Sequence, residues 1–357
     1  MIRVTVAVVL ICVLASAARA QSEPAPEVSE PQPDVSRTRR ALAVGAALVP
    51  GALLHGSGHR VIGEQRTAGR LLALEAAGLG LLMLGAVPLG VSGAASDVSG
   101  PAIASMVAGG TVFLAGILAD AYGASGLSAR AGRAAPVSRA RLELEVGYAY
   151  VDDPQFEYGS FTVLHAELLL GPARLTPTAW LALDDDNQRV TIDAAYCVLA
   201  GRDDSRLEAV LGITRHLYGT EDFAVTGFEA SAAGRLELSR VGPSLRGAFF
   251  DLMLGVGVER VGYLDANDWN SQLLGRAAFG VYLGDGGGAA SVHYDHRRDD
   301  FAGGLALARG GGFIGHFGAA AHYRVLGPWS ASLMIERGAA NVARLGVSRG
   351  FELGPGR

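Results

Sequence analysis

The sequence contains no lysine, so all 30 of its basic residues are arginine. The 35 acidic residues outnumber them, and the formal net charge is −5. A nucleic-acid-binding protein shows a basic patch or a high pI. The charge balance therefore excludes nucleic acid as a partner. The exclusive use of arginine reflects genome composition and implies no function.

Cysteine and aromatic residues are also scarce. Cys12 and Cys197 are too few for a disulfide framework or a cysteine-based zinc site. Aromatic residues make up 7% of the chain and charged residues 18%, against 50% hydrophobic residues. A disordered chain has the opposite balance. The 50 glycines follow no three-residue period, so collagen is excluded as well.

The first twenty residues have the pattern of a cleavable export signal. Arg3 precedes an apolar run from Val4 to Leu14, and Ala18-Arg19-Ala20 supplies a small-x-small cleavage site. The apolar run is too short to span a membrane comfortably. We expect residues 1–20 to be a signal peptide and the mature chain to be exported.

Two different compositions follow this segment. Residues 21–40 carry four prolines among Ser, Glu and Gln, which predicts a disordered linker. Residues 41–135 are apolar, and Ala68 to Val91 and Pro101 to Tyr122 are each long enough to cross a bilayer. Both are rich in Gly and Ala, and the first contains Arg70 and Glu75. They predict an α-helical hairpin that is either inserted in a membrane or packed on itself through small residues.

From residue 141 onward, apolar and polar residues alternate with a period of two. Leu142, Leu144 and Val146 share one face of a predicted strand, with Glu143 and Glu145 on the other. The same alternation recurs to the end of the chain, which predicts strands with one apolar and one polar face. A soluble β-sandwich would show this pattern too. The predicted strands, however, run to about 9–13 residues, the length that crosses a bilayer at a tilt, whereas globular strands have ~5–6.

The connections between these strands alternate in character. One set is short and built from Gly, Pro or Arg, as in 171–174, 240–243 and 326–328; the other is generally longer and acidic, as in 151–159, 262–271 and 297–312. This alternation is typical of outer-membrane barrels, with short periplasmic turns and longer outer loops. The count predicts an all-β antiparallel transmembrane β-barrel of about twelve strands over residues 141–351, preceded by the helical hairpin.

The last predicted strand ends in an aromatic residue, Phe351, close to the C-terminus. With the strand pattern, this resembles the terminal signature of Gram-negative outer-membrane β-barrel proteins of the porin-like kind. The resemblance implies a location in the cell outer membrane, contact with outer-membrane lipid and lipopolysaccharide, and insertion by the barrel-assembly machinery. The helical hairpin is of no known family, and self-association through it stays an open expectation.

Histidines supply most of the candidate chemistry. His55 and His59 stand four residues apart, but the two glycines between them favour a tight turn over a helical metal site. Ser291, His293 and Asp295 share one strand face. Residues two apart on a strand are roughly 6–7 Å apart, too far for a nucleophile–base hydrogen bond. A hydrolase would need partners from neighbouring strands, and the inward-facing His165, His316 and His322 are candidates.

The acidic run Asp184-Asp185-Asp186 offers oxygen ligands for Ca²⁺, but it lacks the spacing of a calcium loop and sits at a predicted hairpin tip. A solvated turn is the favoured interpretation. We therefore expect no catalytic residue, no metal site and no cofactor.

Charged residues of the polar strand faces would line the barrel lumen. The strongest candidates are Glu143, Glu145, Arg189, Asp193, Glu229, Arg235, Asp251, Arg276 and Arg324, and the same faces carry Glu167, Glu208, Glu237, Glu336 and Arg344. A twelve-stranded barrel is wider than one that side chains just fill and narrower than a large porin. Two interpretations stay open: a salt-bridged plug, or a narrow channel with a weak preference for cations.

The sequence thus predicts an outer-membrane β-barrel with a structural or passive small-solute permeability role and no catalysis. Two alternatives remain. One is a periplasmic β-domain anchored in the inner membrane by the helices, and the other is a barrel hydrolase using lumen Ser and His residues.

Overall fold

The computed structural model describes residues 35–93, 96–129, 141–153, 159–201, 203–219, 223–263, 266–284, 287–296, 301 and 315–352. The predicted signal peptide and most of the predicted linker lie outside these residues. The chain divides into two compact units, Met1–Arg133 with Glu237–Phe250, and Ala134–Leu236 with Asp251–Arg357.

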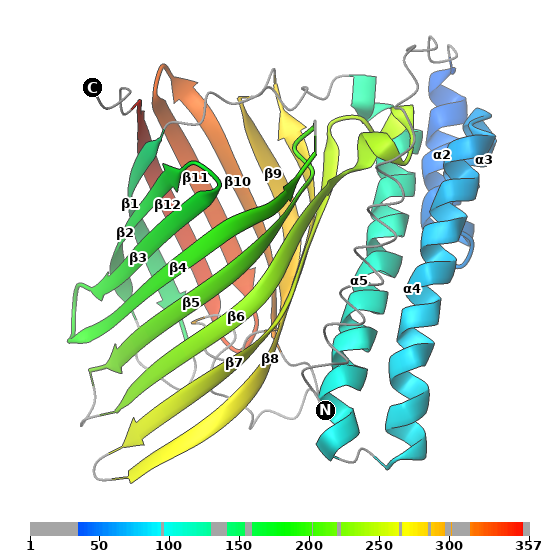
Figure 1. Ribbon diagram of the computed structural model, residues 1–357. Helices are drawn as coiled ribbons and strands as arrows, with labels where there is room; N and C mark the ends of the chain where they lie inside the picture. Colours follow the sequence, from blue (N-terminus) through cyan, green and yellow to red (C-terminus); the bar gives the residue numbers. More distant parts are fainter. Residues whose placement is uncertain are drawn as a thin grey trace. The chain divides into compact units, whose positions relative to one another are not determined.

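The described residues of the first unit form four α-helices (Figure 1). They are α2 (Arg37–Leu48), α3 (Ser57–Ile62), α4 (Gln65–Val91) and α5 (Ser96–Ser125). Short 3₁₀ turns are η1 (Pro50–Ala52), η2 (Leu127–Ala129), η3 (Leu238–Arg240) and η4 (Pro243–Leu245). The Ser36 hydroxyl accepts a hydrogen bond from the Arg39 backbone N–H and caps α2. The last four residues of the predicted linker are therefore helical, a correction that this cap explains.

Helices α4 and α5 form the predicted hairpin and pack through glycine. A Cβ atom built on Gly78 would lie 2.9 Å from the Gly109 carbonyl oxygen, and one on Gly109 would lie 2.5 Å from that of Gly78. Such close backbone approach tolerates no larger side chain. Two helices of the described chain, over Gln65–Val91 and Val98–Ser125, are long and apolar enough to cross a membrane. Membrane insertion of the hairpin stays a prediction.

The second unit is a closed antiparallel barrel of twelve strands, as the sequence predicts (Figure 1). The strands are β1 (Leu142–Asp152), β2 (Ser160–Leu170), β3 (Ala173–Ala182), β4 (Asn187–Ala200), β5 (Arg206–Tyr218), β6 (Ala224–Glu237), β7 (Ala248–Tyr263), β8 (Ala266–Leu283), β9 (Gly288–Asp295), β10 (His316–Leu326), β11 (Trp329–Arg337) and β12 (Asn341–Phe351). Each strand neighbours the next along the chain, and β1 closes the ring on β12.

Register defines two ends of the barrel. Leu142 pairs with Phe351, so the first and last residues of the barrel lie at one end, here called the turn end. The connection from β1 to β2 lies at the opposite end, here called the loop end. Two connections differ from expectation. Residues 266–271 begin β8 instead of lying in a loop, and the turn predicted at 240–243 spans 238–247 with two 3₁₀ turns.

The apolar face of the strands points away from the lumen. The side chain of Val146 is 60% exposed, while neighbouring Glu145 is 9% exposed. Leu211 and Val347 on the outside are likewise 64% and 54% exposed. A soluble sandwich would bury this face, whereas a transmembrane barrel presents it to lipid. The barrel therefore has the architecture of an outer-membrane, porin-like β-barrel.

Candidate functional site in the barrel lumen

The predicted lumen charges face inward, and toward the turn end they form a network around Arg235. This guanidinium makes two hydrogen bonds to Asp251, Nε to Oδ1 at 2.7 Å and Nη2 to Oδ2 at 2.8 Å. Its Nη1 donates to Asp204 Oδ2 at 3.0 Å. Tyr282 also donates to that oxygen, at 2.8 Å. Arg235 thus joins β6 to β7 and to the turn between β4 and β5.

Asp204 lies in that turn and is held in its charged form. Burial raises the pKa of this carboxyl group, but Arg206 and Arg235 lower it by more, so the net pKa lies below its usual value. Arg206 Nη1 lies 2.7 Å from Asp204 Oδ1. The sequence places Asp204 in a turn and gives no sign of its role, because the partner Arg235 lies on the next hairpin.

A second network links β2, β3 and β5. Arg174 contacts Glu208 at 2.7 Å and Glu167 at 3.5 Å. Arg206 extends the chain of charges, with Nε 3.5 Å from Glu208. The sequence pattern predicts that Arg174 lies in a turn, whereas the structure places it in β3 as a lumen cation. The sign available was its alternation with Thr176 and Thr178 on one face of β3.

Further pairs lie on β1 and on β8 to β12. Arg344 forms an ion pair with Glu145, and Ser348 donates to Glu143 at 2.6 Å. His322 lies 3.5 Å from Glu143. Arg276 is 4.0 Å from Asp295. These contacts favour the salt-bridged interpretation for much of the lumen.

Two further predicted carboxylates meet at a glycine of β5. Asp193 and Glu229 are both paired in register with Gly212, one from each side. A Cβ on Gly212 would lie 2.6 Å from Asp193 Oδ1, so the missing side chain leaves room for both carboxylates. Arg324 is exposed and makes no ion pair within the described part of the chain. Asp193 and Glu229 lie on either side of the same glycine, between β4 and β6.

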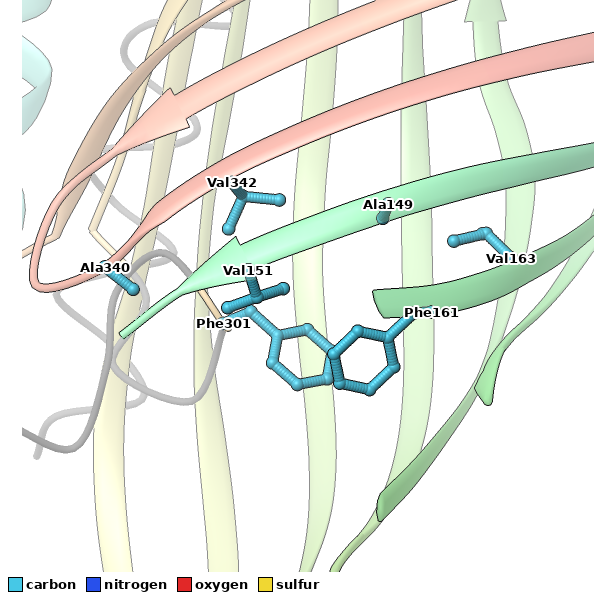
Figure 2. Packing of buried hydrophobic residues seen from close by; sticks show 7 residues of the cluster. All are labelled: Ala149, Val151, Phe161, Val163, Phe301, Ala340 and Val342. Atoms are coloured by element: carbon cyan, nitrogen blue, oxygen red, sulfur yellow. The ribbon is translucent and has the colours of Figure 1, made fainter. Parts of the chain in front are cut away.

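An apolar cluster lies at the loop end of the lumen. Ala149, Val151, Phe161, Val163, Phe301, Ala340 and Val342 form a buried cluster, with Trp180 packed against it. Figure 2 shows the rings of Phe161 and Phe301 against each other, beside Val151 and Val342. The Phe301 centroid lies 4.9 Å from that of Phe161 and 5.0 Å from that of Trp180.

Phe301 reaches this position from the far side of the barrel. It follows β9 in the chain, and β9 and β3 are six places apart in the ring of twelve strands. Its ring nevertheless contacts Trp180 of β3 and His216 of β5, and it lies 5.8 Å from the Arg189 guanidinium of β4. The Phe301 ring therefore lies inside the lumen, against the strands opposite β9. It is the one described residue of the predicted 297–312 loop, and the sequence offered no sign of its inward position.

The histidines of the helical unit are buried, and the tight turn predicted for them is only partly right. Gly56 has φ +83°, but α3 begins directly after it and contains Gly58 and His59. Asp120 of α5 explains this helix start, because its carboxylate accepts the backbone N–H groups of Gly58 and His59, both at 3.1 Å. Glu75 accepts the His55 backbone N–H at 2.7 Å.

His59 connects Asp120 to Ser244, which lies between β6 and β7. Nδ1 is 2.6 Å from Asp120 Oδ1, and Nε2 is 3.0 Å from Ser244 Oγ. The order of contacts matches a Ser-His-Asp hydrolase. Ser244 is completely buried, however, and its hydroxyl donates to Glu64. A hydroxyl whose single proton is used there gives none to His59, so this network acts as a structural connection.

Two further predictions concern residues of the barrel. Asp185 Oδ1 accepts the Asn187 N–H at 2.7 Å, the hydrogen bond of a turn, and residues 184–186 are exposed. The favoured turn is therefore confirmed. The structure does not assemble Ser291, His293 and Asp295 into a hydrolase site. Instead, His293 contacts Glu336 at 2.9 Å.

Comparison with protein-family models yields no match, and none of the curated proteins matches the sequence. The chain is similar to the solved KdgM porin at 9% identity, over 59% of this chain and 99% of that one, with a TM-score of 0.37. It is similar to the outer membrane protein Omp33 of Acinetobacter baumannii at 8% identity, over 60% of this chain and 99% of that one, with a TM-score of 0.32. It is similar to the translocator domain of the autotransporter NalP from Neisseria meningitidis at 12% identity, over 59% of this chain and 89% of that one, with a TM-score of 0.35.

Proposed function

We propose that the barrel is a passive outer-membrane channel for small cations that Phe301 narrows at the loop end. The observation that carries this proposal is the position of Phe301, which follows β9 in the chain and whose ring contacts side chains of β3 and β5 on the other side of the lumen. A barrel with a purely structural role needs no such contact. Loops that occupy the polar interior close some transmembrane barrels.

Charge supports the preference for cations. Nine carboxylates and five guanidinium groups belong to the lumen set named from the sequence. Rings of acidic side chains select cations in membrane pores. Each ion pair uses one acid and one arginine, so the acidic excess of this set decides the sign of the field in the lumen.

Location and partners follow from the same architecture. The apolar outer face contacts outer-membrane lipid and lipopolysaccharide, and the barrel-assembly machinery inserts the chain. In single-chain barrels with an even number of strands, both ends of the sheet face the periplasm. The turn end, with Leu142 and Phe351, is then periplasmic and the Phe301 cluster faces outward. Self-association through the helical hairpin is part of the proposal.

Single-channel recording in planar bilayers tests the channel. Purified full-length protein is compared with Phe301→Ala, which removes the ring from the lumen, and with Phe317→Ala, which removes an outward ring that is 54% exposed. We expect cation-selective conductance that rises several-fold in Phe301→Ala and is unchanged in Phe317→Ala.

Silence of both the wild type and Phe301→Ala, in samples that are folded by their heat-dependent mobility on a gel, would contradict the channel. It would leave the barrel a structural role. Anion selectivity would contradict the argument from charge alone.

A further inference from the structure

Two histidines and a glutamate meet on the lumen wall. His293 of β9, His316 of β10 and Glu336 of β11 each offer one ligand atom, and these atoms all lie within 4.8 Å of one another. His293 Nε2 is 2.9 Å from Glu336 Oε1, and His316 Nε2 is 3.5 Å from the same oxygen. No other such group occurs among the described His, Cys, Asp and Glu residues.

Gly318 makes this meeting possible. It is paired in register with His293 on one side and with Glu336 on the other. A Cβ on Gly318 would lie 2.5 Å from Nε2 of His293 and 2.8 Å from Cγ of Glu336. Because glycine has no side chain, two residues that are separated by a whole strand touch above it. His316 approaches from two residues earlier on β10.

The three side chains are withdrawn from solvent. His293 and His316 are each 1% exposed and Glu336 is 8% exposed. Nδ1 of His293 is buried and has no hydrogen-bond partner among the described residues. Nε2, on the other side of the ring, is the nitrogen that faces Glu336, so it is the nitrogen available to bind an ion.

We infer that His293, His316 and Glu336 bind a divalent transition-metal ion, of which Zn²⁺ is the best match. Two imidazole nitrogens with one carboxylate oxygen form a zinc ligand set that leaves a fourth position for water. Bonds of about 2.0–2.2 Å place tetrahedral ligands roughly 3.3 Å apart. The 2.9 and 3.5 Å separations already bracket that spacing, and a rotamer adjustment closes the remaining gap between the histidines.

The site lies at the ends of the two strands that flank the segment containing Phe301. His316 is the first residue of β10, and His293 lies two residues before the end of β9. A bound ion therefore joins the two strands between which the chain carries Phe301. If the proposed channel function holds, Zn²⁺ alters conductance through this segment; the metal site itself does not depend on that function.

Metal binding is tested directly on full-length protein in detergent micelles. The protein is stripped with a chelator, exchanged into chelator-free buffer and titrated with Zn²⁺ by calorimetry and with Co²⁺ by its visible absorption. We expect one ion per chain and a tetrahedral Co²⁺ spectrum. His316→Ala and Glu336→Gln should each weaken binding at least tenfold. His322→Ala, which removes another lumen histidine from β10, should leave binding unchanged.

Gly318→Ala separates positioning from ligation. It keeps all three ligands but inserts a methyl group between two of them, so binding should weaken while the heat-dependent gel mobility of the folded barrel is retained. No stoichiometric uptake by the folded wild type would overturn the site. Equal affinity in the wild type, His316→Ala and Glu336→Gln would overturn it too. Binding without any effect of Zn²⁺ on conductance would leave the site standing and count only against its link to the channel.

Discussion

Single buried residues decide the electrostatics of the helical unit. His55 is completely buried, its ring lies 4.6 Å from that of Phe113, and Glu75 and Asp120 lie near it. Burial lowers the pKa of His55, and the two carboxylates oppose this shift without overcoming it. The folded protein therefore holds His55 neutral at a pH where an unfolded chain binds a proton.

This difference predicts a pH dependence. As the pH falls through about 6.5, the pKa of histidine in an unfolded chain, the unfolded state gains a proton that the folded state does not. The free energy of unfolding should then fall by up to about 1.4 kcal/mol per pH unit, until His55 itself is protonated. Hydrogen exchange of α3 and α4 amides at pH 7.5 and 5.5 measures this change. In His55→Leu the loss should shrink, and an identical loss in both proteins would contradict the assignment.

At the scale of elements, helices α4 and α5 are held together by close backbone packing at glycines. There is no space for a side chain at Gly109 of α5, because an added Cβ would lie 2.5 Å from both the Gly78 carbonyl oxygen and the Leu82 backbone nitrogen. Gly110, the next residue, has only a Leu82 methyl carbon at 3.9 Å. One helix thus supplies a test position and its own control.

Gly109→Ala should destabilise the hairpin by about 1–3 kcal/mol, because the backbones must separate. Gly110→Ala should instead stabilise it by roughly 0.5–1 kcal/mol, the ordinary gain of alanine over glycine inside a helix. Hydrogen exchange of α4 and α5 amides in detergent gives both values. The same sign for both substitutions would show that the glycine contact does not hold the helices.

Strands carry the contact with lipid. Leu211 lies near the middle of β5 and Leu326 ends β10 at the turn end; both are outward and exposed. Arginine on the lipid face costs roughly 2–4 kcal/mol at the bilayer midplane and about 0–1 near the interface. Leu211→Arg should therefore impair refolding into vesicles much more than Leu326→Arg, as read from heat-dependent gel mobility and urea unfolding. Equal effects would favour the alternative of a soluble periplasmic β-domain.

At the scale of the whole molecule, closure of the ring creates the lumen and what crosses it. Antiparallel neighbours alone would leave an open sheet, in which Phe301 and Trp180 lie far apart. Pairing of β1 with β12 brings β9 opposite β3, so that a residue following one strand reaches the other across the interior. The channel proposal and the Phe301→Ala experiment depend on this closure.

The sequence by itself determined the two-part organisation, the number of strands and the faces they present. Alternation such as that from Leu142 to Tyr150 is a local property, because successive side chains of a strand point to opposite sides whatever the strand pairs with. It therefore predicts Glu145 inside and Val146 outside without knowledge of the fold. The apolar helices are predicted for a similar local reason.

Only the tertiary structure decided which of these side chains meet. His293 and Glu336 are 43 residues apart in the sequence. They touch because β10, the strand between theirs, has a glycine, Gly318, at the position that pairs with both. His59 and Ser244 are 185 residues apart, and His59 reaches Ser244 because the chain between β6 and β7 belongs to the helical unit. Register and closure bring together residues that are far apart along the chain, and a period of two contains no information about either.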